Sequence, residues 1–465
     1  MVAQARKVLR NGQLVTPKGV FLGDVVIEGD KIADVVPGGV DEAQLADAEV
    51  FDATGCWVYP GFIDAHTHMQ CWTGMDWTAD SFETGTRAAA CGGTTTIVDY
   101  ATQDKGMTLH RALDEWHKRA DGTCTANYAF HMAIADWNDH TREEIADMRE
   151  AGITSFKTYF AYDHLRLDDA QTMEVLEAIK PFDGILCVHC ENGTLVNELQ
   201  RRVLAEGITG PEGHPLSRPA ECEAEAISRL MYLSELTGAR VNVVHCSTRL
   251  GLEQVRAARE RGVRVSLETC PQYLALDDGV YYGANWSMAA RYVCAPPIRA
   301  EENQRALWRG LRRGEIQTIS TDHCSFTLAQ KDMGREDFTK IPGGLPGVET
   351  RGEVVYTRGV AAGRMTVAGM GRTLCENPAK LYGLYPRKGV IAAGSDADIV
   401  VYDPKASHIL SARDMVTKAG YTPFEGLRTE GGIAKVYLRG SLMVEDGRIV
   451  GGPEGQYLRR GLCTL

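Results

Sequence analysis

The sequence has no apolar run long enough to cross a membrane and no excess of basic residues. No stretch approaches the 18 apolar residues of a membrane-spanning helix, and the amino terminus lacks an apolar segment followed by a small-residue cleavage site. The formal net charge of −12 argues against a nucleic-acid partner, because phosphate binding needs clustered lysine and arginine. We therefore expect a cytoplasmic protein that binds neither membranes nor nucleic acids.

Internal repeats and low-complexity segments are also missing, and the composition is that of a globular chain. Apolar residues make up 44% of the sequence and charged residues 24%, which excludes disordered and fibrous proteins. The 465 residues exceed the usual limit of about 250 to 300 for one hydrophobic core, so we expect two structural units. Thirteen cysteines, an odd number, favour reduced buried thiols over a disulfide framework.

Histidines and an aspartate stand at the ends of several short apolar segments. Residues 57–63 predict a buried strand that delivers His66 and His68, and residues two apart in an extended chain point the same way. A single histidine of this kind is more often a core residue or a loop hydrogen-bonder, but packing hardly explains the whole set. Three later β-branched segments repeat the design; they end in His189, His245 and Asp322.

These side chains are suitable ligands for a pair of divalent metal ions. Histidine and carboxylate ligands suit zinc, with manganese, cobalt or iron as alternatives. Two ions at the roughly 3.5 to 4 Å spacing of two-metal hydrolysis need a bridging anion. Lys157 ends another strand segment and offers one, because a lysine of lowered pKa can react with carbon dioxide to give a carbamate. The alternative for Lys157 is an ordinary salt bridge.

Between residues 57 and 385 the sequence alternates predicted strands with predicted helices. Such alternation predicts a parallel sheet, and eight units predict an α/β protein with a (β/α)8 barrel of the TIM type. Reactive residues of that fold lie at the carboxyl ends of the strands, where the proposed ligands occur. The strand candidates are residues 57–64, 94–100, 128–135, 154–160, 184–190, 241–247, 263–270 and 318–323.

The two ends of the chain contain shorter alternating strands separated by turns. Residues 1–56 include KVLRNGQLV and GDVVIEGDKIADVV, and residues 386–465 resume the pattern with GVIAAGSDADIVVYDP and GIAKVYLRGSLMVEDGRIV. We expect both ends to form one small β-sandwich, followed by a C-terminal tail, beside a catalytic barrel of residues 57–385.

The motifs DAHTH, SFK, VHCEN, VHCS and TDHC, in this order, resemble the cyclic amidohydrolases of the dihydropyrimidinase and hydantoinase family. Longer stretches, LSRPAECEAEAISRL, ETCPQYL, STDHCSFTLAQ and GGLPGVETR, resemble the phenylhydantoinase branch in particular. The resemblance covers essentially the whole length. It implies a binuclear-metal hydrolase that opens 5-substituted hydantoins or dihydropyrimidines to N-carbamoyl amino acids, assembled as a homotetramer or homodimer.

The resemblance also implies which residues hold each ion. The more buried ion would be held by His66, His68 and Asp322. The more exposed ion would be held by His189 and His245. Lys157, as N6-carboxylysine, would hold both ions.

Two further roles are implied by the resemblance. A hydroxide bridging the ions would attack the ring carbonyl, and Asp322 would carry its proton to the departing nitrogen. Tyr162 would donate its phenolic hydrogen to the developing oxyanion, with Tyr159 as the nearest competitor for that role.

Two positions depart from the family pattern in the loops that bind the substrate ring. Ala295 stands before Pro296 and Pro297 where family members have serine, and Gly343 replaces an asparagine. Both positions hold the ring amide chiefly through main-chain groups, so we expect ring binding to persist. Side-chain contributions are lost, and the glycine loosens its loop.

Rival functions remain open at this stage. A dihydroorotase needs a partner for the ring carboxylate, such as a bidentate arginine soon after the HxH pair, but MQCWTGMDW follows here. Allantoinase is the other enzymatic alternative, and a non-catalytic scaffold is disfavoured because all six ligands are present. A wall for an apolar substituent, with core packing as the alternative, is suggested by Met69, Trp72, Met75 and Trp77.

Overall fold

The centre of the protein is an eight-stranded parallel sheet that closes almost completely into a barrel. The computed structural model describes residues 6–42, 45–283 and 285–465, and each barrel strand pairs with the next one along the chain. This order confirms the predicted TIM-type barrel. The strands are β6 (Phe62–Thr67), β7 (Thr94–Thr102), β8 (Asn127–Ala133), β9 (Ser155–Tyr159), β10 (Ile185–His189), β11 (Arg240–Val243), β12 (Val265–Thr269) and β13 (Thr318–Ile319).

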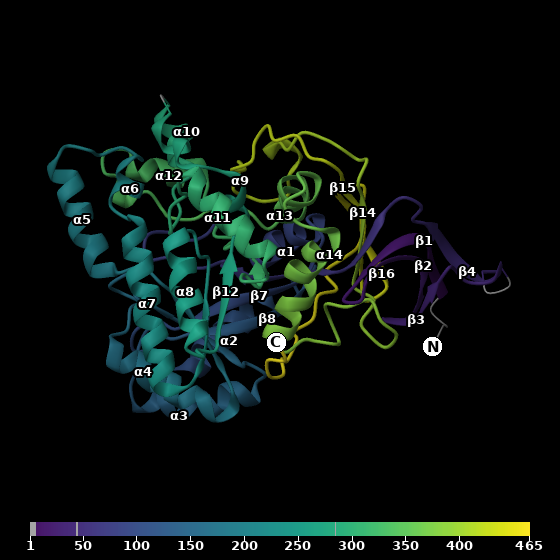
Figure 1. Ribbon diagram of the computed structural model, residues 1–465, viewed down its shortest axis with the longest axis horizontal. Coiled ribbons are helices and arrows are strands. Elements are labelled where there is room, and N and C mark those ends of the chain that lie inside the picture. The colour runs from purple at the N-terminus through teal and green to yellow at the C-terminus, as the bar shows by residue number, and fades with distance from the viewer. Residues whose placement is uncertain (1–5, 43–44, 284) are drawn as a thin grey trace.

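Long helices cover the outside of the barrel (Figure 1). Most begin at a Ser, Thr, Asn or Asp whose side chain accepts a backbone N–H of the first turn, a contact worth about 1 kcal/mol. These helices are α1 (Phe82–Cys91), α2 (Leu109–Ala120), α3 (Asp139–Glu150), α4 (Asp169–Ile179), α5 (Gly193–Ala205), α7 (Ala220–Thr237), α8 (Arg249–Glu260) and α11 (Glu301–Arg312). Shorter helices lie in the connections: α6 (Gly213–Leu216), α9 (Pro271–Ala275), α10 (Trp286–Ala290), α12 (Leu328–Lys331), α13 (Arg351–Val355), α14 (Val367–Gly371) and α15 (Asn377–Leu381).

A buried arginine closes the seam between the first and last barrel strands. Arg351 is fully buried, and its Nη1 donates to the carbonyl of Ile63 in β6 (2.8 Å) and of Ile319 in β13 (3.0 Å). An isolated bridge between Thr67 and His323 joins the same two segments at the carboxyl end. The two ends of the barrel sheet are therefore held at a fixed spacing beneath the predicted site.

The two termini build one separate mixed sheet, as expected. Antiparallel pairing of β5 with β14 joins the N-terminal strands to the C-terminal ones, and Figure 1 shows this sheet at one side of the barrel. Its nine strands are β1 (Arg6–Thr16), β2 (Gly19–Glu28), β3 (Lys31–Pro37), β4 (Ala48–Asp52), β5 (Trp57–Pro60), β14 (Ile399–Asp403), β15 (Gly432–Leu438), β16 (Ser441–Glu445) and β17 (Arg448–Ile449).

The apolar run at residues 57–63 belongs to both sheets, so the expectation of one strand there is wrong. It divides at Gly61: β5 pairs with β1 and β14, and only β6 enters the barrel. A Cβ atom at Gly61 would lie 2.0 Å from Oγ1 of Thr95. Only glycine leaves room for the chain to pass from one sheet to the other at this point.

Two predicted absences can be compared with the structure. All thirteen cysteines lie in the described part of the chain, and all carry free thiols. Among the residues that the structure describes, no helix has the length and apolar character that a membrane crossing would require.

Candidate metal centre and active site

A cavity of about 340 Å³ opens at the carboxyl ends of the barrel strands. The structure brings all nine predicted site residues to its wall. Strand polarity explains the convergence, because the carboxyl ends of parallel strands meet at one face of a barrel. The nine residues are His66, His68, Lys157, Tyr162, His189, His245, Ala295, Asp322 and Gly343.

His66, His68 and Asp322 form a group that can hold a metal ion. Their potential ligand atoms all lie within 4.8 Å of one another. Oδ1 of Asp322 is 3.1 Å from Nε2 of His66 and 3.2 Å from Nε2 of His68. Nε2 of His66 is buried and makes no hydrogen bond in the described structure. Two imidazoles and a carboxylate that converge in this way fit a divalent ion such as zinc.

A buried carboxylate behind His66 sets the orientation of its ring. Oε1 of Glu268, at the end of β12, accepts from Nδ1 of His66 (2.7 Å) and from the backbone N–H of His245 (3.2 Å). Protonation of His66 at Nδ1 leaves the Nε2 lone pair directed at Asp322. The sequence analysis assigned no role to Glu268, although this carboxylate ends a predicted strand in the ETCPQYL motif.

His189 and His245 form a second pair of converging imidazoles. Nδ1 of His189 lies 2.9 Å from Nε2 of His245. The other nitrogen of His189, Nε2, lies 2.9 Å from Glu191, which Arg218 contacts at 2.5 Å. Although burial alone would raise it, Arg218 and His189 lower the pKa of Glu191 to about 2. The ionised carboxylate therefore keeps the proton of His189 on Nε2 and leaves Nδ1 free as a ligand.

Lys157 lines the same cavity as these two groups of imidazoles. Its side chain is 1% exposed, and the described residues give its ammonium neither a hydrogen bond nor an ion pair. Nζ lies 4.5 Å from the centre of the Tyr100 ring and 5.1 Å from that of Tyr159. Burial lowers the pKa of Lys157. The expected alternative, an ordinary salt bridge, is absent from the described contacts.

Three of the predicted site residues have a left-handed backbone. The φ angles are 66° at Tyr162, 41° at His245 and 53° at Asp322. Such a conformation costs a residue other than glycine about 1–3 kcal/mol and concentrates at functional sites. It also ends the strands early: β11 stops at Val243 and β13 at Ile319, so the predicted strands 241–247 and 318–323 are too long. The side chains of His245 and Asp322 thereby turn into the cavity.

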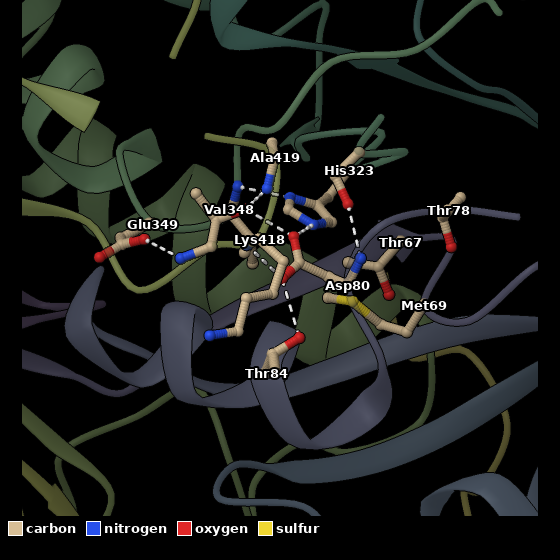
Figure 2. A network of polar contacts seen from close by, with 12 residues as sticks. Thr67, Met69, Thr78, Asp80, Thr84, His323, Val348, Glu349, Lys418 and Ala419 are labelled. Carbon is tan, nitrogen blue, oxygen red and sulfur yellow. Dashed lines mark hydrogen bonds and ion pairs between the residues drawn. The ribbon is translucent and has the colours of Figure 1, made fainter. Parts of the chain in front are cut away.

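His323 follows Asp322 but belongs to a separate buried network (Figure 2). Its Nδ1 accepts the backbone N–H of Gly347 (3.1 Å), and its Nε2 lies 3.2 Å from Asp80. Asp80 in turn accepts from Oγ1 of Thr417 (2.5 Å) and the backbone N–H of Lys418 (2.9 Å). The network fastens the connection between β14 and β15, residues 404–431, to the loop that carries the aspartate.

Of the two candidate oxyanion donors, Tyr162 has its ring closer to His189. Its ring centre is 5.0 Å from that of His189, and its hydroxyl makes no hydrogen bond within the described residues. Burial raises the pKa of Tyr162, so its hydroxyl stays protonated and can donate. Tyr159 also lines the cavity, but it is 6% exposed, and its ring is farther from His189, at 6.2 Å.

The four apolar residues after the HxH pair divide between core and cavity mouth. Met69 is fully buried and packs against α1 at Gly85. For this residue the alternative of core packing therefore applies. Trp72 and Met75 line the cavity while 48% and 42% exposed. Trp77 contacts Trp72 outside the lining, with ring centres 5.9 Å apart. The predicted apolar wall therefore consists of Trp72 and Met75.

Comparisons with known proteins agree with this geometry. The model of the amidohydrolase family matches residues 57–448. D-hydantoinase of Geobacillus stearothermophilus is 42% identical over 98% of this chain and 96% of its own length. D-phenylhydantoinase of Escherichia coli O1:K1 / APEC is 37% identical over 98% of each chain. The crystal structure of dihydropyrimidinase from Brevibacillus agri NCHU1002 covers 99% of this chain and 100% of its own, at 40% identity and a TM-score of 0.96. The chain therefore belongs to the amidohydrolase family, in the group of hydrolases that includes the hydantoinases and dihydropyrimidinases.

Proposed function

We propose that this protein is a binuclear-metal hydrolase that opens the cyclic amide bond of 5-substituted hydantoins and dihydropyrimidines to give N-carbamoyl amino acids. One observation carries the proposal. Two groups of ligating side chains face a single cavity, and a buried lysine without a counter-ion lies beside both.

The donor set suits two divalent ions: ligand chemistry favours zinc first and then manganese, cobalt or iron. His66, His68 and Asp322 would hold one ion and His189 and His245 the other. The four histidines and the single aspartate include no group assigned to bridge the two ions. A carbamate on Lys157, that is N6-carboxylysine, would supply the bridging anion. The ions, when bound, would polarise the ring carbonyl and lower the pKa of a water from near 16 toward about 7.

Residues of the protein provide proton transfer, stabilisation of the oxyanion and binding of the ring. Asp322 accepts the proton of the attacking water and delivers it to the departing ring nitrogen, as general base and then general acid. Tyr162 donates its phenolic hydrogen to the oxyanion that forms on the carbonyl. The main-chain groups of Ala295 and Gly343 hold the ring amide, since both residues line the cavity and neither side chain offers a hydrogen bond.

An apolar or aromatic 5-substituent fits the mouth of the cavity. Trp72 and Met75 are exposed lining residues, and the buried Phe338 and Ile341 contribute further apolar lining to the cavity. A polar ureido substituent would leave its hydrogen-bonding groups against this wall, which counts against the allantoinase alternative. Several relatives are named D-hydantoinase or D-phenylhydantoinase, and we extend the preference for the D-enantiomer to this chain.

The site residues also count against the alternative that the protein is a non-catalytic scaffold. A non-catalytic homologue would have no reason to keep six ligands, two supporting glutamates and a cavity open to solvent.

We also propose that the protein works in the cytoplasm as a homotetramer or homodimer, with a small cyclic amide as its only substrate class.

A substrate panel with purified enzyme tests the proposal. The panel contains dihydrouracil, hydantoin, both enantiomers of 5-phenylhydantoin, allantoin and dihydroorotate, with ring opening followed by loss of ultraviolet absorbance and by mass spectrometry. We expect D-5-phenylhydantoin to give the highest kcat/KM. Dominance of allantoin or dihydroorotate would reassign the substrate, and hydrolysis of no ring by metal-loaded protein would overturn the function.

A further inference from the structure

Lys331 is a second buried lysine, and it has no acidic partner in the described structure. It ends α12 and is 1% exposed. Its Nζ donates to the backbone carbonyls of Val293 (2.8 Å), Pro342 (2.6 Å) and Gly344 (2.8 Å). An ammonium has three hydrogens, so these acceptors use all of its donors. Burial lowers the pKa of Lys331 to about 7, whereas three carbonyl oxygens favour the charged form.

The three carbonyls belong to the two loops that carry Ala295 and Gly343. Val293 lies two residues before Ala295, and Pro342 and Gly344 flank Gly343. The backbone N–H of Gly344 also donates to the carbonyl of Val293, at 3.0 Å. Lys331 therefore joins both loops without lining the cavity, and no other side chain among the described residues contacts both loops by hydrogen bonds.

Most neighbouring carbonyls of the first loop are already engaged. Nε2 of His214 lies 2.8 Å from the carbonyl of Cys294, and the hydroxyl of Tyr273 donates to the carbonyl of Pro296 at 2.8 Å. The main-chain N–H and C=O groups of Ala295 make no hydrogen bond with any described residue. At Ala295, therefore, the backbone N–H and C=O groups of this loop are free to hydrogen-bond a ligand.

The second loop has the same arrangement. The carbonyls on either side of Gly343 accept from Lys331, whereas the main-chain groups of Gly343 itself have no partner within the described residues. A Cβ atom at Gly343 would lie 4.0 Å from the backbone nitrogen of Ala295. The two free backbone segments therefore lie next to each other at the cavity wall.

We infer that Lys331 is a positioning residue that fixes the spacing between the main-chain groups of Ala295 and Gly343 for binding of the ring amide. The inference rests on the proposed function, because it takes a cyclic amide as the ligand of these groups. Lys331 itself is not among the residues that line the cavity. Since every substrate shares the amide, loss of Lys331 affects all substrates by the same factor, whatever their 5-substituent.

The test is Lys331→Met, which retains an unbranched side chain, one atom shorter, but removes the charge and the donors. kcat and KM are measured with hydantoin and with D-5-phenylhydantoin, together with metal content. We expect kcat/KM to fall roughly ten- to hundredfold, mainly through KM, by the same factor for both substrates and with metal content unchanged. A KM within twofold of the wild type, or a rise confined to phenylhydantoin, would overturn the inference.

Lys388→Met is the matched control for the loss of a buried lysine. Nζ of Lys388 contacts Asp396 (2.8 Å) and Asp398 (2.6 Å), outside the residues that line the cavity. This variant is expected to lose stability while its KM stays at the wild-type value. An equal rise of KM in Lys388→Met would show that the effect is one of general destabilisation, and the inference would be wrong.

Two milder variants keep the test decisive if Lys331→Met does not fold. Lys331→Arg retains the charge and several donors, and Lys331→Gln retains two donors without charge. We expect the KM of the arginine variant to lie nearer the wild-type value than that of the glutamine variant; equal values overturn the inference. Failure of the proposed function is recognised separately, because the wild-type enzyme would then open none of the rings.

Discussion

Two of the four proposed imidazole ligands, His66 and His189, have a carboxylate behind the ring that decides which nitrogen faces the cavity. Glu268 faces Nδ1 of His66, and Glu191 faces Nε2 of His189. The two histidines therefore offer different nitrogens, Nε2 and Nδ1, although both stand at strand ends. Carboxylates of this kind typically change metal affinity 10–100-fold when they are mutated.

Glu268→Gln tests this orientation. The amide can turn its N–H₂ toward His66 and stabilise the wrong tautomer, so we expect metal affinity to fall about 10–100-fold, measured by competition with a chelator of known affinity. Glu353→Gln is the control, because Glu353 also pairs with a histidine, His408, at 3.4 Å, but outside the cavity lining. Unchanged metal affinity in Glu268→Gln would show that His66 needs no such support.

Tyr162→Phe separates transition-state stabilisation from metal binding. Loss of an oxyanion donor typically costs about 10²- to 10³-fold in kcat. We expect a loss of that size with metal content unchanged, as determined by steady-state kinetics and elemental analysis. Tyr159→Phe is measured in parallel. A larger loss of kcat in Tyr159→Phe would assign the donor role to that residue, and loss of metal in Tyr162→Phe would show a different role for Tyr162.

At the scale of elements, the barrel strands are predictable because buried parallel strands have an apolar, β-branched signature. All eight predicted segments overlap a barrel strand. The sequence is less informative where the chain changes partner. Residues 57–63 have one continuous apolar signature, yet Gly61 divides them between two sheets because only glycine can pass Thr95.

The residues at which the strands end could not be predicted from the periodicity of the sequence either. His245 and Asp322 follow β-branched runs, but their left-handed backbone takes them out of the ladder, and nothing in the local residue types predicts that conformation. The supporting residues were missed for another reason. Glu268 and Lys331 contact residues far apart in the sequence, and Glu191, although two residues from His189, depends on the distant Arg218; such contacts appear only when the elements are assembled.

The stability of the folded protein depends on pH through Glu349, which binds the connection formed by residues 404–431. The carboxylate of Glu349 accepts the backbone N–H groups of Val416 and Thr417, and burial raises its pKa to about 7. Between about pH 4.5 and 7 the folded protein therefore binds more protons than the unfolded chain, and its stability falls as the pH rises through this range. Above that pH the loss is complete and stays constant.

Glu349→Gln removes this titration and retains an oxygen acceptor. We expect the variant to be more stable than the wild type at pH 8 and the difference to shrink to nothing near pH 4.5, as followed by urea denaturation at several pH values. A stability difference that does not change with pH would contradict the assignment of the raised pKa to Glu349.

At the scale of the whole molecule, the proposed ions link the first, fourth, fifth, sixth and eighth barrel strands. An ion that binds only the folded state adds about 2.7 kcal/mol when its free concentration is 100 times its Kd. Metal removal should therefore lower the stability of the barrel as a whole. Arg351 and the buried core hold the barrel independently, so the protein without metal should still be folded at room temperature.

Dialysis against a chelator tests this coupling. We expect Tm to fall by at least a few degrees and activity to vanish, with both restored by zinc together with bicarbonate. Differential scanning calorimetry and elemental analysis follow the two states. An unchanged Tm with no metal in the protein as purified would favour the non-catalytic scaffold.

The central claim is that a carbon-dioxide-modified Lys157 bridges two ions, and a crystal structure with anomalous diffraction tests it most directly. The protein is purified without chelator at neutral pH in the presence of bicarbonate and zinc. We predict density for a planar carboxylate on Nζ of Lys157 and two anomalous peaks, one beside His66, His68 and Asp322 and one beside His189 and His245. An unmodified Lys157 with no ion near either group would contradict the account.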